Sequence, residues 1–93
     1  MLYSIMKKFN VPNISNVYRL NRSNDNVVYA VDARVMEMDK NHFGWTPYTM
    51  WCVESFGKSQ YEKRWWCKLT EASTMTYYFK RQAEANWFVL RWS

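Results

Sequence analysis

The chain has few of the residues that catalytic and phosphate-binding motifs require. It contains one histidine, His42, and only two glycines in 93 residues. Two glycines leave no Gly-rich loop to cradle a phosphate. His42 has no Ser or Cys nucleophile near it in the sequence, and the carboxylates are dispersed rather than paired, so no acid–base or nucleophilic set is indicated. We therefore expect a protein that is not an enzyme, has no catalytic residues and uses no cofactor.

Cysteine is equally scarce. Cys52 and Cys67 are too far apart for a CxxC motif, and two cysteines are too few for a disulfide scaffold or a zinc site of their own. They are expected to be reduced thiols in the core, and no metal site is predicted.

Long apolar runs and blocks of like charge are also missing. No stretch approaches the roughly 18 apolar residues of a membrane span. The opening sequence MLYSIMKKFN places its charges after a short apolar run, whereas a signal peptide places them before a longer one. No block of like charges forms a basic arm. These absences predict a soluble, cytoplasmic protein with no membrane partner.

Aromatic residues, in contrast, are abundant. Phe, Trp and Tyr make up 19% of the chain, and six residues are tryptophan. A chain of this length forms one domain, 1–93, with a single core. The aromatic area exceeds what such a core can hold, so some is left for a partner. The net charge of +5 permits an acidic partner: a nucleic acid, a nucleotide or an acidic protein surface.

The first half of the chain is typical of strands. Residues 1–15 are interpreted as a lead strand or a docked arm. Residues 16–22 and 26–38 predict a hairpin, because apolar residues alternate along both segments and turn-forming residues join them. A register that pairs Tyr18 with Val31 brings the two apolar faces together.

The second half predicts another hairpin, a strand and a helix. Residues 45–56 and 61–69 form the hairpin, and 74–79 the further strand. A helix is expected to begin near Lys80 and to continue through about Val89, although WFVLRW could also run out as a final strand. The prediction is an α+β fold, an antiparallel β-meander of four to five strands with one C-terminal helix packed on one face. Four residues, Phe79, Ala83, Trp87 and Leu90, are expected to dock the helix, with Lys80, Arg81 and Glu84 in solvent.

The segment KRWWCK, Lys63 to Lys68, carries the predicted binding surface. Strand alternation places Trp65 and Cys67 in the core and leaves Trp66 on the other face. In the predicted hairpin that face holds Trp51, Arg64, Trp66 and Lys68. The face is either covered by a helix or arm, or free to contact a protein or to stack on the bases of a single-stranded RNA or DNA.

The C-terminal run FKRQAEANWFVLRWS resembles the tails of small accessory proteins of tailed, T-even-like bacteriophages. The resemblance depends on Phe79, Ala83, Trp87 or Phe88, and the closing Leu90, Arg91 and Trp92. It implies a small protein in the host cell cytoplasm that binds and redirects or inhibits a host protein, or sequesters a nucleotide defence signal. For the nucleotide alternative, Tyr77, Tyr78 and Arg81 are further contributors.

Exposed sheet edges also invite a homodimer.

Overall fold

The computed structural model describes residues 14–22, 26–35, 46–71 and 73–93. The segment before residue 14, most of the expected turn after Arg22, and His42 lie outside the described residues. Within them the chain forms four strands and two helices: β1 Tyr18–Asn21, β2 Val27–Arg34, α2 Pro47–Phe56, β3 Trp65–Glu71, β4 Thr74–Phe79 and α3 Gln82–Trp92.

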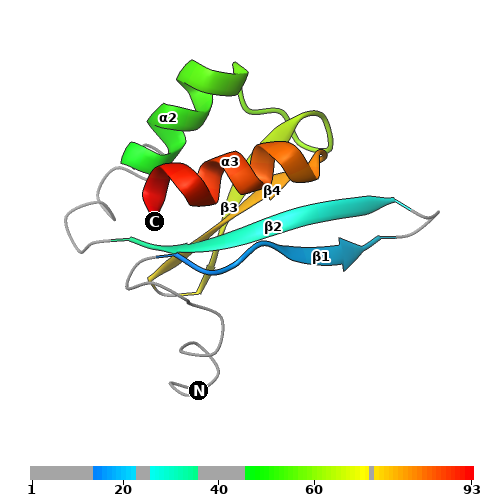
Figure 1. Cartoon of the computed structure of the whole chain (residues 1–93), viewed down its shortest axis with the longest axis horizontal. Helices are drawn as coiled ribbons and strands as arrows, with labels where there is room; N and C mark the ends of the chain where they lie inside the picture. Colours follow the sequence, from blue (N-terminus) through cyan, green and yellow to red (C-terminus); the bar gives the residue numbers. More distant parts are fainter. Residues whose placement is uncertain (1–13, 23–25, 36–45, 72) are drawn as a thin grey trace.

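The strands form one antiparallel sheet in the order β1-β2-β4-β3, with both helices on the same face (Figure 1). The predicted α+β class, antiparallel sheet and C-terminal helix are confirmed. Because β4 lies between β2 and β3, the chain leaves the sheet after β2 and returns at the edge after forming α2. The C-terminal helix runs to Trp92, so WFVLRW is helical and not a strand.

The predicted strand at 45–56 is wrong, because most of this segment is helix α2. Thr46 caps the helix: its hydroxyl accepts a hydrogen bond from the Thr49 amide at 3.3 Å. Pro47 follows at the first helical position, where a missing amide hydrogen costs nothing. Gly57, at φ 89°, ends the helix in a conformation that glycine adopts without strain. These local signals outweigh the alternation of apolar residues.

The register predicted for the first hairpin is also wrong by one residue. Tyr18 lies opposite Ala30 rather than Val31. Both faces of β2 are buried, Val28 and Ala30 on one and Val31 on the other, so apolar alternation does not select a face. On the face that Tyr18 occupies, its hydroxyl donates a 2.7 Å hydrogen bond to the buried carboxylate of Asp32. This bond fits the observed register.

The core lies between the helices and the sheet. Phe88 of α3 is completely buried, with its ring centroid 5.0 Å from that of Tyr77 and 5.6 Å from that of Phe79. The Tyr77 hydroxyl forms hydrogen bonds with those of Thr46 at 2.7 Å and Thr49 at 2.6 Å. The residue at the centre of β4 therefore joins the start of α2 to the sheet by polar bonds and α3 by ring packing.

Burial raises the pKa of the Cys52 thiol and of the Tyr18 and Tyr77 hydroxyls. In the unfolded chain these groups ionise near their ordinary values, about 8.5 for Cys and about 10 for Tyr. Folding stability from these groups is thus fully present below these values, and it is lost progressively as pH rises above them toward the higher pKa values of the folded state. We expect the free energy of unfolding in urea to fall between about pH 8 and pH 10. The Cys52→Ala variant should lose less stability over this pH range. A wild-type free energy of unfolding that stays constant or rises would contradict the prediction.

Candidate functional site

The four residues predicted to form one binding surface do not lie together. Trp51 is on α2, with its ring edge-on to Phe56 at 5.3 Å and 6.0 Å from Phe88. Trp66 is on β3 opposite Tyr78, on the face of the sheet opposite to the one that carries Trp65 and Cys67 into the core. The expected contact between Trp51 and Trp66 is therefore wrong, because a helix replaces the strand that was to carry Trp51.

Alternation along β3 is as expected. Trp65 and Cys67 contribute to the core, while Trp66 and Lys68 point to the other face. Trp66 is nevertheless only 5% exposed. Its ring stacks on that of Tyr78, with centroids 5.3 Å apart, and the exposed Tyr61 ring lies edge-on to it at 5.5 Å. Trp66 is thus a packing residue, and Arg64 and Lys68 are the exposed members of the predicted set.

Arg64 connects the helices to the sheet. Its Nε and Nη2 donate to Oε2 of Glu84 at 2.9 and 2.7 Å, and its Nη1 donates to the Phe56 carbonyl at 3.2 Å. The bond to Glu84 raises the pKa of the Arg64 guanidinium. Arg64 therefore stays charged and holds α3 in a fixed rotation about its axis.

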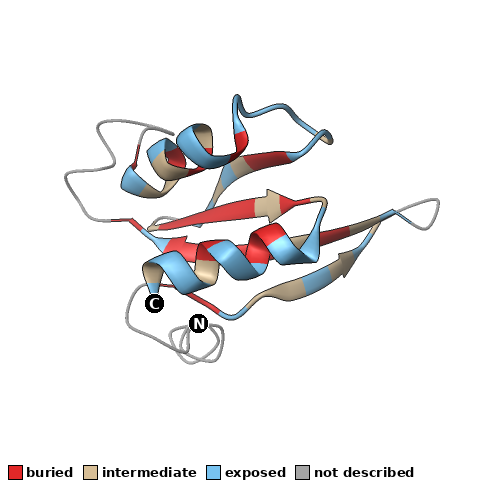
Figure 2. Cartoon of the chain, turned by 45° about the horizontal axis from the view of Figure 1, so that its top comes forward, coloured by how far each residue is buried: buried red, intermediate tan, exposed pale blue. Residues whose placement is uncertain are grey.

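This rotation reverses the predicted faces of α3. Glu84 is buried against the sheet instead of lying in solvent, and Phe88 fills the core. Ala83, Trp87 and Leu90, which we call the α3 stripe, are exposed on the outer side of the helix, which Figure 2 shows in pale blue. Trp87 is 59% exposed and Leu90 75%. The prediction that these residues dock the helix is wrong, because the Arg64 pair and Phe88 occupy the inner face.

The α3 stripe borders a shallow apolar hollow of about 440 Å³. Glu84 and Asn86 complete its lining. The Trp87 ring lies at the edge of this hollow and packs near the Phe56 ring, with centroids 6.3 Å apart. This contact holds the Trp87 ring in place while its outer side remains exposed.

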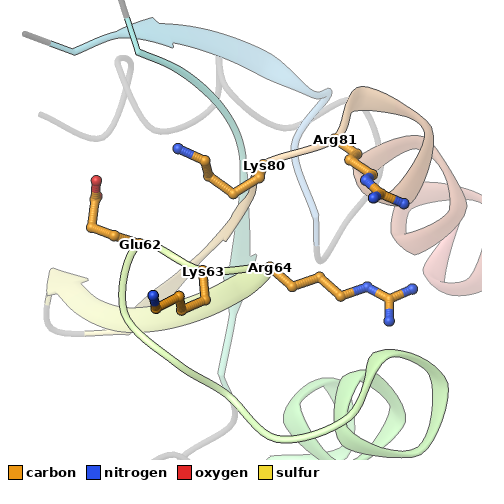
Figure 3. A pocket seen from close by; sticks show the side chains of 5 residues that line it. All are labelled: Glu62, Lys63, Arg64, Lys80 and Arg81. Atoms are coloured by element: carbon orange, nitrogen blue, oxygen red, sulfur yellow. The ribbon is translucent and has the colours of Figure 1, made fainter. Parts of the chain in front are cut away.

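A second hollow, of about 510 Å³, lies at one end of the β3–β4 pair and is lined by Glu62, Lys63, Arg64, Lys80 and Arg81 (Figure 3). Trp65 lies opposite Phe79 across the two antiparallel strands, so the residues before β3 meet those after β4. The Lys80 amide donates to the Arg64 carbonyl at 3.0 Å, which continues the pairing by one residue. We call this the cationic hollow.

The part of the chain that the structure describes holds neither a disulfide nor a group of side chains suited to a metal ion. Both cysteines are free, and no three His, Cys, Asp or Glu side chains there are grouped so that they could hold a metal ion. Neither described helix has the length and apolar character needed to cross a membrane. No family model, curated protein or solved structure matches the chain.

Proposed function

We propose that this protein is a small, non-enzymatic binding protein that presents the α3 stripe to another protein. The observation that supports the proposal is the exposure of Trp87 and Leu90, at 59% and 75%, on a helix whose opposite side is fully packed. Tryptophan is enriched among the residues that dominate interface energies. A contiguous apolar patch on a folded domain commonly marks a contact surface.

The spacing of the α3 stripe indicates what the partner offers. Ala83, Trp87 and Leu90 follow one another at i, i+4 and i+7, the pattern by which a helix lies in an apolar groove. Exposed arginines flank the stripe, Arg81 at the start of α3 and Arg91 in its last turn. The partner that fits is a protein with an apolar groove and an acidic rim.

The resemblance to phage accessory proteins gives this proposal a biological setting. A partner in the host cytoplasm would be a host protein, and occupying its groove would inhibit or redirect it. The basic net charge of +5 favours encounter with an acidic host surface.

The test is to truncate the α3 stripe and measure binding. We expect Trp87→Ala to weaken the complex by about 2 kcal/mol or more, which is roughly 30-fold in Kd, and Leu90→Ala to act in the same direction. A protein captured from bacterial lysate by the wild type would be purified and titrated calorimetrically against each variant.

Tyr61→Ala is the matched control, because it removes another exposed aromatic ring, 68% exposed, that lies away from α3. Equal binding by wild type and Trp87→Ala would contradict the proposed surface. Sedimentation of the free protein tests whether the α3 stripe instead binds a second copy of this chain. If the wild type is a homodimer that Trp87→Ala dissociates, the proposal of a different partner is overturned.

A further inference from the structure

The cationic hollow concentrates positive charge at one place in the fold. Two Lys-Arg pairs line it, Lys63-Arg64 before β3 and Lys80-Arg81 after β4. Figure 3 shows the side chains of Lys63 and Lys80 extending to one side of the two strand ends and those of Arg64 and Arg81 to the other. Like charges brought together across strands destabilise a sheet, so this arrangement opposes folding unless a ligand or counter-ion uses it.

The nearby carboxylates do not neutralise this charge. Glu84 binds Arg64 at 2.7 Å, and Glu62 pairs with Arg22 of the β1–β2 hairpin at 2.9 Å. The other three cations, Lys63, Lys80 and Arg81, form no ion pair within the described ranges. The hollow therefore offers three uncompensated cations to an anion.

The backbone adds to this potential. Helix α3 begins at Gln82, directly after Arg81, and no side chain caps its first turn. The start of a helix carries a partial positive charge, and its backbone amides donate hydrogen bonds to anions. The start of α3 therefore lies beside the basic side chains of the cationic hollow, which also favour an anion.

We propose that the cationic hollow binds a phosphate-bearing ligand, either a nucleotide or a single-stranded nucleic acid. Its volume of about 510 Å³ is more than one phosphate fills, and three free cations suit a ligand with several negative charges. Beside it, Tyr61 precedes the lining residue Glu62 and is 68% exposed, with one edge supported by Trp66. An exposed, supported ring next to phosphate-binding cations is the arrangement that stacks on a nucleic-acid base. Arg81 borders both this hollow and the α3 stripe, but Trp87 and Leu90 do not line the hollow.

The test compares two double variants with the same change in net charge. Lys63→Gln with Lys80→Gln alters the hollow, while Arg19→Gln with Lys58→Gln alters two exposed basic residues outside it. Each pair of changes lowers the net charge from +5 by two, to +3. The probes are a short fluorescein-labelled oligothymidylate, ATP, and polyglutamate as an anion without phosphate.

We expect the oligothymidylate to bind at low salt, and the hollow variant to weaken it about tenfold or more while the control pair has little effect. The slope of log K against log salt should become shallower by about 1.4 in the hollow variant, since each contact to single strands contributes about 0.7. Competition by ATP would assign the site to free nucleotides, and its absence to a strand; both outcomes support a phosphate site. Tyr61→Ala should weaken oligothymidylate binding about fivefold or more if the base stacks there.

Three results would overturn the proposal. They are no binding of either phosphate probe at low salt, equal weakening by the two double variants, and polyglutamate binding as tight as that of the oligothymidylate. Thermal unfolding of each variant shows that it is folded, which these changes at basic surface residues should permit.

Discussion

Phe88→Ala is expected to destabilise the fold by about 3–5 kcal/mol, the range for removing a large buried aromatic side chain. Phe88 is completely buried, and its ring lies within 6.0 Å of those of Tyr48, Trp51, Tyr77 and Phe79. The smaller side chain would leave a cavity where α2, α3 and the sheet meet. Since a domain of this size is stable by only about 5–15 kcal/mol, the loss is a large part of the total. Urea unfolding followed by circular dichroism measures it.

The adjacent residue is the control for the orientation of α3. Trp87→Ala removes a larger side chain, but one that is 59% exposed, and its effect should be much smaller than that of Phe88→Ala. If Trp87→Ala costs as much stability as Phe88→Ala, or more, the helix is rotated differently and the α3 stripe is part of the core. Such a result would also remove the basis of the proposed function.

Trp66→Ala is the second change with a large expected effect, again about 3–5 kcal/mol. The Trp66 ring is 5% exposed, stacked on Tyr78 and covered at one edge by Tyr61. Its removal takes away both ring contacts and leaves a cavity on the far face of the sheet. Thermal and urea unfolding give the change in stability directly.

Lys68→Ala is the matched control on the same strand and the same face. Lys68 is exposed, so the substitution should change stability by no more than about 0.5 kcal/mol. A Trp66→Ala variant as stable as the wild type would show that the ring is not packed. Trp66 would then be free to contact a partner, as the sequence KRWWCK predicts.

The sequence predicts the sheet better than the helices because alternation is a property of each strand alone. β4 and the inner face of β3 follow directly from it. Helix α2 is missed although its signals are present: a capping Thr46, then Pro47, and a terminating Gly57. Aromatic and apolar residues at alternating positions in the same segment favour a strand, and here the end signals are the better guide.

The rotation of α3 could not be predicted from its own sequence. The helix is apolar on two sides, with Ala83, Trp87 and Leu90 on one and Ala85 and Phe88 on the other. Tertiary contacts select the buried side: Phe88 packs against Tyr77 and Phe79, and Glu84 binds Arg64, 20 positions away. The cationic hollow is easier to predict from the sequence, because a register that pairs β3 with β4 brings its two Lys-Arg pairs together.

Contact between the α3 stripe and a different protein is tested most directly by site-specific photo-cross-linking. A photoreactive benzophenone amino acid at position 90, where Leu90 is 75% exposed, is compared with the same group at Asn21, an exposed position on β1. Irradiation in bacterial lysate followed by mass spectrometry identifies the adducts. If the α3 stripe contacts another protein, position 90 gives a specific adduct with that protein and position 21 gives none. Adducts from position 21 without any from position 90 would contradict this contact.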